Sequence, residues 1–302
     1  MTAPAFLATA GLTLVAIVVV RAASRRAVRR AVEARLGTQG PEGVVRGAEP
    51  IILQGSSPVS VLALHGFGDT PQSLAYLAKA LHSRGWTVHV PLLPGHGRSI
   101  DALADSTGAA WLDGARRELD ALRIAGGRLA IVGQSMGAAL TVLLAAGTPD
   151  VEACVLISPL LSVTSTMRRG ARSWRLIGTI WPYVDSNDER SIRDPAERAL
   201  SRGFGALPVR LLPELVGLVA RARAALARVV APTLVVQSTD DNRVTVDGTD
   251  GAFRLINAAD KQLVWRTGAG HVLTVDAGHD EVIALAGDWI ASHTVAATVP
   301  RR

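Results

Sequence analysis

Short apolar runs alternate with longer amphipathic stretches over most of the chain. The apolar runs are rich in β-branched residues and nearly continuous, which is the pattern of strands buried on both faces of a sheet. We predict strands over Val59–Leu64, Thr87–Val90, Arg128–Val132, Ala153–Ile157, Thr233–Val236 and Gln262–Trp265. Helices are predicted over Ser73–Ser83, Ala110–Ile124, Met136–Ala146, Pro213–Val229, Val246–Ile256 and Asp280–Ala291. This alternation of strand and helix predicts an α/β fold with a doubly wound, mainly parallel sheet.

One long interval interrupts the alternation. From Leu160 to about Pro208 the sequence contains no convincing strand. About fifty residues are too many for an ordinary connection between two strands, so we predict a helical cap over one end of the sheet. Aromatic residues of this cap are candidates for the wall of a substrate channel, and packing of the cap onto the sheet explains them equally well. These candidates are Trp174, Trp181, Tyr183 and Phe204.

The first 35 residues have a pattern of their own. No ionisable side chain occurs from Met1 to Val20, and six arginines against one glutamate follow in residues 21–35. At about 1.5 Å per residue, an apolar helix of this length spans a bilayer core of about 30 Å. Cleaved signal peptides carry positive charge before the apolar run, so the order here favours an uncleaved transmembrane helix over a cleaved export signal or a buried core helix. Arginine-rich flanks stay in the cytoplasm, which predicts a single-pass membrane protein with a cytoplasmic C-terminal portion.

Composition narrows the possible functions. Of the 302 residues, 48% are hydrophobic and 19% charged, which favours a folded domain over intrinsic disorder. The formal net charge is +6, but residues 21–35 supply +5 of it, so the rest of the chain has no basic excess for nucleic acid. The single cysteine, Cys154, cannot form an intramolecular disulfide, and no Cys/His cluster has the spacing of a zinc site. Hydrophobic packing must therefore hold the fold.

The strongest chemical signal is the pentapeptide Gly133-Gln134-Ser135-Met136-Gly137, between a predicted strand and a predicted helix. A sharp strand-to-helix turn strains the central residue, and glycines two positions away keep the crowded space free of side chains. Ser135 would project above the sheet, where the N-terminal amides of the next helix stabilise negative charge. We predict that Ser135 is a nucleophile. The alternative is an ordinary glycine-flanked turn.

A second glycine-rich loop, His65–Asp69, directly follows the strand Val59–Leu64. An oxyanion hole needs two backbone N–H groups that face the nucleophile, and glycines let the main chain approach closely. We predict that the amides of Phe67 and Met136 fill this role. A tight turn in which His65 is a hydrogen-bonded spacer is the alternative.

A nucleophilic serine needs a general base, and the sequence contains seven histidines. His271 follows a glycine-containing loop shortly after the strand Gln262–Trp265, so it lies at the sheet edge where ligands bind in such folds. We assign the base to His271, with His279 and His96 as alternatives.

A carboxylate must orient this base, and two adjacent aspartates follow the strand Thr233–Val236. Successive side chains diverge, so only one of the two is expected to face the imidazole. Asp241 is the candidate, and Asp240 is the alternative. The carboxylate would hold the neutral tautomer of His271 and stabilise the imidazolium that forms during proton transfer.

With these motifs the chain resembles the α/β-hydrolase superfamily, and more narrowly its small carboxylesterases and monoacylglycerol lipases. The chain order Ser135, Asp241, His271 is the order of that fold. Further segments that carry the resemblance, which runs from about residue 58 to 290, are Pro91–Gly97, Leu156–Pro159, Pro232–Gln237 and Gly270–Thr274 with Asp276. The resemblance implies an α/β-hydrolase fold with a small helical cap. It also implies an acyl-enzyme serine esterase with no cofactor, and it places Phe67 and Met136 in the oxyanion hole.

The predicted organisation has three parts. Residues 1–35 form the membrane anchor, residues 36–57 form a linker with an edge hairpin around Val44–Gln54, and residues 58–300 form the hydrolase domain with its cap at about 160–208. The predicted function is a serine carboxylic-ester hydrolase whose substrate is a small-molecule or lipid-derived ester. An acyltransferase that uses the same three residues, or a ligand-binding protein without catalysis, is the alternative. The membrane is the expected partner, and no oligomeric state follows from the sequence.

Overall fold

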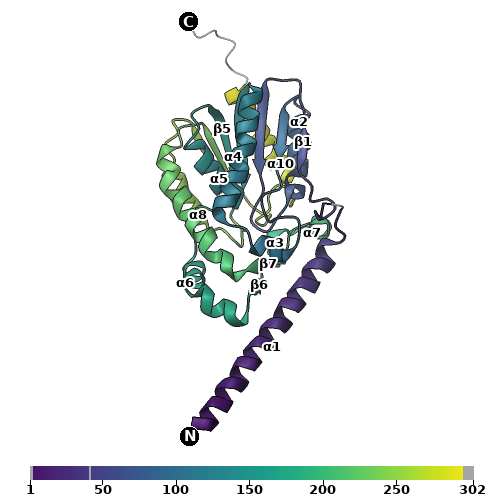
Figure 1. Ribbon diagram of the computed structural model, residues 1–302. Coiled ribbons are helices and arrows are strands. Elements are labelled where there is room, and N and C mark those ends of the chain that lie inside the picture. Colours follow the sequence, from purple (N-terminus) through teal and green to yellow (C-terminus); the bar gives the residue numbers. More distant parts are fainter. Residues whose placement is uncertain (1–2, 41, 295–302) are drawn as a thin grey trace.

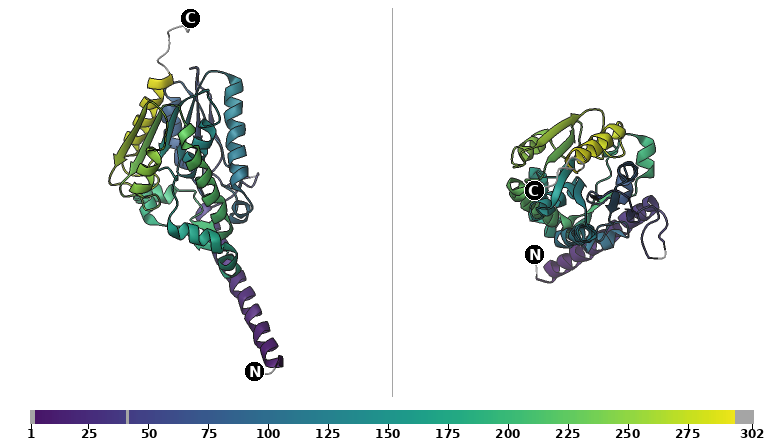
Figure 2. Two further views of the ribbon diagram at one scale, coloured as in Figure 1. Left: turned by 90° about the vertical axis from the view of Figure 1, so that its left-hand side faces the viewer. Right: turned by 90° about the horizontal axis from the view of Figure 1, so that it is seen from above.

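The computed structural model describes the backbone of residues 3–40 and 42–294, and the side chains from residue 11 onward within those ranges. A seven-stranded sheet has the order β1-β3-β2-β4-β5-β8-β9 (Figures 1 and 2). β1 is antiparallel to β3, and every other neighbouring pair is parallel. The strands are β1 (Ile51–Leu53), β2 (Val59–Leu64), β3 (Thr87–Val90), β4 (Arg128–Gln134), β5 (Val151–Ile157), β8 (Thr233–Ser238) and β9 (Lys261–Arg266). The carboxyl ends of the parallel strands meet at one edge, where ligand sites form in such sheets.

Helices cover both faces of this sheet. Along β2, Val59, Val61 and Ala63 belong to one hydrophobic cluster, whereas Leu62 and Leu64 belong to the other. Successive side chains of a strand point to opposite faces, so a continuous apolar strand supplies both clusters. The helices are α2 (Ala75–His82) and α10 (His279–Thr294) on the first face, and α4 (Gly108–Ala125), α5 (Met136–Ala145), α8 (Leu212–Ala225) and α9 (Val246–Phe253) on the second. A short helix, α3, covers Ile100–Ala104.

The α/β fold with a mainly parallel sheet is confirmed. β2 and β3 have the predicted bounds, and each of the other four predicted strands is longer by two residues. Three of the added residues, Gln134, Gln237 and Ser238, are polar and fully buried. Because these residues are polar, the apolar pattern ends before them. They nevertheless extend the strands to the edge of the sheet where the site forms.

The segment before β2 differs from the predicted hairpin around residues 44–54. β1 pairs with β3, and only an isolated antiparallel bridge joins Gln39 to Val45. Val44, Val45 and Ala48 are buried in the larger hydrophobic cluster. Glycine and proline spacing indicated the turns here correctly, but it contains no information about which strand β1 contacts.

The interval between β5 and β8 forms the cap. It contains α6 (Ser165–Ile180), α7 (Pro195–Leu200) and the strands β6 (Tyr183–Asp185) and β7 (Ala206–Pro208), which pair antiparallel. The prediction of a strand-free cap is wrong for β6 and β7, because three residues are too few for a readable alternation. Short 3₁₀ turns occur at Pro71–Leu74, Glu189–Ser191, Val209–Leu211 and Leu226–Arg228.

The N-terminal residues form one long helix, α1 (Ala3–Leu36), whose first part projects from the body of the molecule (Figure 1). Its last part packs on the cap and the domain, where Val32 and Leu36 are buried. Among the described residues, no helix has the length and apolar character that a bilayer span requires. The predicted transmembrane helix is therefore not supported there, and the first half of its apolar run, residues 1–10, lies outside the described side chains.

Candidate active site

Ser135 occupies a strained turn between β4 and α5. Its backbone has φ 55° and ψ −115°, a positive φ that non-glycine residues rarely adopt. A Cβ atom at Gly133 would lie 2.3 Å from the carbonyl oxygen of Gly137, and one at Gly137 would lie 2.0 Å from that of Leu64. Both positions therefore require glycine. The turn holds the Ser135 side chain above the carboxyl end of β4, as the pentapeptide predicts.

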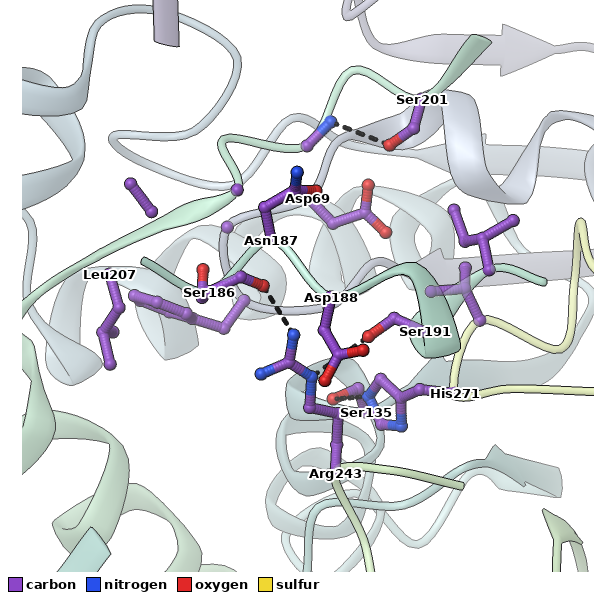
Figure 3. A pocket seen from close by; sticks show the side chains of 18 of the residues that line it. Asp69, Ser135, Ser186, Asn187, Asp188, Ser191, Ser201, Leu207, Arg243 and His271 are labelled. Carbon is purple, nitrogen blue, oxygen red and sulfur yellow. Dashed lines mark hydrogen bonds between the residues drawn. The ribbon is translucent and has the colours of Figure 1, made fainter. Parts of the chain in front are cut away.

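His271 connects Ser135 to Asp241. Its Nε2 atom lies 2.8 Å from Ser135 Oγ, and its Nδ1 atom lies 2.8 Å from Asp241 Oδ2 (Figure 3 shows the Ser135 contact). In the sequence, Ser135 lies 136 positions before His271, and Asp241 lies 30 positions before it. They follow β4, β8 and β9, which are near or adjacent in the sheet, so strand order brings them together.

Several donors fix the carboxylate of Asp241. Oδ1 accepts hydrogen bonds from the backbone amides of Arg243 (2.6 Å) and Val244 (3.0 Å), and Oδ2 also accepts one from Gln237 Nε2 (2.9 Å). Burial alone would raise the pKa of Asp241, but the attraction of His271 and these amide donors hold it below its ordinary value. The carboxylate is thus ionised and oriented toward the imidazole.

The alternative residues lie elsewhere. Asp240 accepts a hydrogen bond from the Gly268 amide at 2.7 Å and faces Arg193 at 3.5 Å. His279 contacts the Asp276 carbonyl oxygen and the Asp280 carboxylate. His96 is buried, with Nδ1 3.1 Å from the Pro94 carbonyl oxygen. The described contacts therefore single out Asp241 and His271.

The two predicted oxyanion residues flank the serine. Met136 begins α5, so its amide belongs to the N-terminal turn, whose N–H groups have no partner within the helix. Phe67 lies in the loop after β2 and lines the same cavity as Ser135. A Cβ atom at Gly66 would lie 3.3 Å from Ser135 Cβ, which shows how closely this loop approaches the nucleophile. The positions suit an oxyanion hole, and that role stays a prediction.

A cavity of about 300 Å³ opens beside Ser135 and His271. None of the four predicted aromatic residues is among the described residues that line it. Phe204 is buried in the core, Trp181 is 55% exposed, and Trp174 and Tyr183 line a different pocket. The interpretation that they pack the cap therefore fits better for Phe204 and Tyr183. Apolar lining comes instead from Phe67, Leu160, Met167, Ile192, Ala206, Leu207, Leu212, Leu215 and Val272.

One carboxylate joins the cap to the loop that carries His271. Asp276 Oδ1 accepts hydrogen bonds from the amides of Arg193 and Asp194 in the cap, each at 2.9 Å. Its Oδ2 accepts one from the Gly270 amide at 2.6 Å, next to His271. Burial would raise the pKa of Asp276, but these amides hold it below its ordinary value. The sequence motif contains Asp276, but nothing in it identifies this tethering role.

Two arginines of the cavity wall were not predicted. Arg35, from α1, donates to the Gly203 carbonyl oxygen (3.0 Å) and to Asn187 Oδ1 (2.5 Å). Arg243, from the loop of Asp241, donates to Ser191 Oγ (3.1 Å) and to the Ser186 carbonyl oxygen (2.5 Å; Figure 3). Neither belongs to a recognisable motif, because each reaches the cavity only through the placement of the cap.

A serine, a histidine and an aspartate that are linked at the edge of a capped parallel sheet define a serine hydrolase of the α/β-hydrolase fold. Residues 56–278 match the model of the family described as serine aminopeptidase, S33, and the chain belongs to this family.

Similar proteins agree with this assignment. The chain is 30% identical over 250 residues to a thermostable monoacylglycerol lipase of Bacillus sp. (strain H-257), which covers 83% of this chain and 97% of that protein. It is 25% identical over 236 residues to a carboxylesterase of Bacillus subtilis (strain 168), with coverage of 78% and 92%. A solved structure from work on the metagenome-derived lipolytic enzymes LipS and LipT has a TM-score of 0.77 and 27% identity, covering 83% of this chain and all of that one. The chain is a serine ester hydrolase, as predicted.

Proposed function

We propose that the chain hydrolyses esters of fatty acids with a small alcohol through an acyl-enzyme on Ser135. The observation that carries this proposal is the pair of 2.8 Å contacts that link Asp241, His271 and Ser135 beside the cavity. A neutral imidazole between a carboxylate and a hydroxyl can take the hydroxyl proton and later return it, which is what acyl transfer requires.

Acylation uses the three linked residues and two backbone amides. His271 Nε2 takes the proton of Ser135 as the serine oxygen attacks the ester carbonyl carbon, and the negative charge moves to the carbonyl oxygen. The amides of Phe67 and Met136 donate hydrogen bonds to that oxygen, while Asp241 stabilises the imidazolium. The bond to the alcohol oxygen then breaks, and His271 protonates the leaving alcohol.

Deacylation repeats these steps with water. His271 takes a proton from the water molecule as its oxygen attacks the acyl carbonyl carbon, and the same two amides hold the oxyanion. The bond to Ser135 breaks, the serine regains its proton from His271, and the carboxylic acid leaves. No step needs a group beyond the residues named.

The cavity supports a lipid-derived substrate. Its volume of about 300 Å³ lies at the lower end of the range for small-molecule sites, and its apolar lining suits an aliphatic chain. Relatives named monoacylglycerol lipase and carboxylesterase support the same substrate class. Monoacylglycerols and short alkyl esters of fatty acids are the substrates to assay first.

Turnover of a monoacylglycerol and of p-nitrophenyl esters by purified variants tests the proposal. Replacement of Ser135 by alanine removes the nucleophile, so activity should fall by a factor of about 10⁴ or more, to a level set by the oxyanion hole and binding alone. Ser158→Ala is the matched control, since Ser158 is also buried at a strand end with positive φ but lies outside the cavity lining. Equal activity in both variants would overturn the assignment of Ser135.

The N-terminal helix brings the enzyme to a lipid surface in this proposal. Leu12, Leu14, Val15, Val18 and Val19 are exposed on α1, with exposed fractions of 57–73%. Clustered arginines follow them, and anionic headgroups attract such residues by about 1 kcal/mol each. Cytoplasmic orientation stays a prediction.

Co-sedimentation with anionic vesicles measures this attachment. The double variant Val18→Asp/Val19→Asp should lose most of its vesicle binding and keep its activity on a soluble ester. Ile124→Asp, at an exposed apolar residue of α4, is the control and should bind like the unmodified chain. Unchanged binding of the double variant would refute the attachment.

A further inference from the structure

We propose that the cavity selects esters whose alcohol part carries an oxyanion, a phosphate or a carboxylate, and that Arg243 and Arg35 provide this selectivity. The inference rests on the proposed ester hydrolysis and narrows its substrate class. Both guanidinium groups line the cavity that contains Ser135, and Arg35 comes from α1, outside the segment that matches the family model.

Neither of these two arginines forms a direct ion pair, although Asp69 and Asp185 attract the charge of Arg35 from a longer distance. Among the described residues, no carboxylate oxygen lies within 4.0 Å of the guanidinium nitrogens of Arg35 or Arg243. Both groups instead donate to neutral acceptors, namely two carbonyl oxygens, one amide oxygen and one hydroxyl. Neutral acceptors satisfy the N–H groups and leave the positive charge in place.

Most of the other charged side chains of the cavity wall pair with a side chain of opposite charge. Asp188 accepts hydrogen bonds from Arg190, with a closest ion-pair distance of 2.8 Å. Arg198 has Glu189 at 3.9 Å and donates to the Ile192 carbonyl oxygen. Asp69 is the remaining acidic group, and its carboxylate is engaged by the Thr70 amide at 2.8 Å. Once these ion pairs are set aside, Arg35 and Arg243 remain opposite Asp69 among the charged residues that line the cavity.

The two arginines act on the same stretch of the cap. Arg243 binds the carbonyl oxygen of Ser186, and Arg35 binds the side chain of the next residue, Asn187. Their guanidinium groups thus hold two consecutive cap residues at the cavity wall. A single small anion at this point would be attracted by both charges.

The geometry places this anion on the alcohol side of the ester. Arg243 binds Ser191 Oγ, and the carbonyl oxygen of Ser191 accepts a hydrogen bond from the Val272 amide at 2.9 Å, next to His271. His271 must protonate the leaving alcohol, so the alcohol part lies toward the base. Arg243, Ser135 and His271 all line this cavity, and Figure 3 labels the three side chains.

Two matched substrate pairs test the proposal. The first compares 1-decanoylglycerol 3-phosphate with 1-decanoylglycerol, and the second compares O-decanoyl glycolate with O-decanoyl glycolamide. Opposite charges about 6 Å apart in a partly wet site change affinity by about tenfold to a hundredfold. We expect kcat/KM to be at least tenfold higher for the anionic member of one or both pairs. The pair that shows the preference identifies the anion as phosphate, carboxylate or either.

Variants assign the preference to the two arginines. Arg243→Gln and Arg35→Gln should each lower the anionic-to-neutral ratio about tenfold, and Arg243→Lys, which keeps the charge, should retain most of it. Arg168→Gln is the control, because it removes the same charge from α6 outside the cavity lining. A ratio near one in the unmodified chain, or an equal fall in Arg168→Gln, would overturn the proposal.

A binding measurement distinguishes a missing preference for anionic esters from a missing ester hydrolysis. The Ser135→Ala chain, with and without Arg243→Gln, is titrated calorimetrically with the same uncleaved decanoyl esters. A dissociation constant about tenfold lower for the anionic ester, lost in Arg243→Gln, supports the inference even for variants that turn over slowly. Hydrolysis of the neutral esters without any anionic preference contradicts the inference alone, whereas absence of all ester hydrolysis contradicts the proposed function.

Discussion

At the scale of single residues, the carboxylate that contacts His271 has another aspartate next to it in the sequence. Asp240 and Asp241 are adjacent, yet only Asp241 contacts His271. Asp240 instead accepts a hydrogen bond from the Gly268 amide. This divergence follows from the turn after β8, where the amides of Arg243 and Val244 hold Asp241 Oδ1. The adjacent pair therefore offers a matched comparison.

Asp241→Asn should lower kcat by about 10³- to 10⁴-fold with little change in stability. An asparagine amide can donate to Nδ1 of His271 and favour the tautomer that cannot accept the serine proton. Asp240→Asn should retain kcat within about threefold. Steady-state kinetics on one p-nitrophenyl ester checks both variants, and similar losses in the two would contradict the assignment.

Sequence reasoning was most complete at this scale, because Ser135, Asp241 and His271, which the structure brings into contact, each follow a strand with a recognisable residue pattern. Gly133 and Gly137 were predicted from the crowding that the structure shows. Arg35 and Arg243 were missed because their roles depend on the path of the cap. The aromatic candidates do not line the cavity for the same reason, since Phe204 and Tyr183 are buried in the larger hydrophobic cluster and Trp181 is exposed.

At the scale of elements, the cap is held by contacts that reach across the chain. α1 supplies Arg21, which donates to the Gly178 carbonyl oxygen at 2.6 Å, and Arg25, which pairs with Asp101 at 3.0 Å. Tyr183 of β6 donates to the same Asp101 at 2.7 Å. On the opposite side, Asp276 ties two cap amides to the loop of His271. The cap is thus fixed to both α1 and the base loop.

Asp276→Ala should lower kcat/KM by about 10- to 100-fold and the free energy of unfolding by about 2 to 4 kcal/mol. The substitution leaves the amides of Arg193, Asp194 and Gly270 without their acceptor, and a small displacement of the base is costly for catalysis. Denaturant unfolding and kinetics measure both effects.

Asp113→Ala, at an exposed position of α4, is the control for Asp276→Ala and should change neither quantity beyond experimental error. If Asp276→Ala keeps full activity, the carboxylate does not position the base loop.

The element boundaries show where sequence patterns stop being informative. β2 and β3 were predicted to the residue because their apolar runs end at clear turns. β6 and β7 have three residues each and pair with each other within the cap, so no periodicity identifies them. The partner of β1 was missed as well, since pairing with β3 depends on the assembled sheet.

At the scale of the whole molecule, buried histidines link stability to pH. His65 and His96 are fully buried, with ring centroids 5.0 Å apart. Burial lowers the pKa of His65 to about 3, with a smaller contribution from His96, and burial lowers the pKa of His96 to about 4. In the unfolded chain, both histidines should titrate near their ordinary pKa of about 6.5.

The free energy of unfolding should therefore fall as the pH falls from about 6.5 to about 4. In this window the unfolded chain binds protons at both histidines and the folded chain does not, so acid favours unfolding. Two protons correspond to about 2.7 kcal/mol per pH unit. Urea unfolding at several pH values measures this slope.

His96→Asn isolates one of the two groups. An asparagine amide can replace the donor that faces the Pro94 carbonyl oxygen, so the fold should persist. The slope between pH 6 and 4.5 should decrease by about one proton relative to the unmodified chain. An identical slope would show that His96 does not contribute to the pH dependence.

In the proposed mechanism, Ser135 carries the acyl group during turnover. Rapid mixing of the intact chain with a p-nitrophenyl ester, acid quenching and peptide mass spectrometry detect this intermediate directly. We expect a burst of p-nitrophenol and an acyl adduct on the peptide that contains Ser135, with no adduct in the Ser135→Ala chain. An acyl group on another residue, or steady turnover in Ser135→Ala, would contradict it.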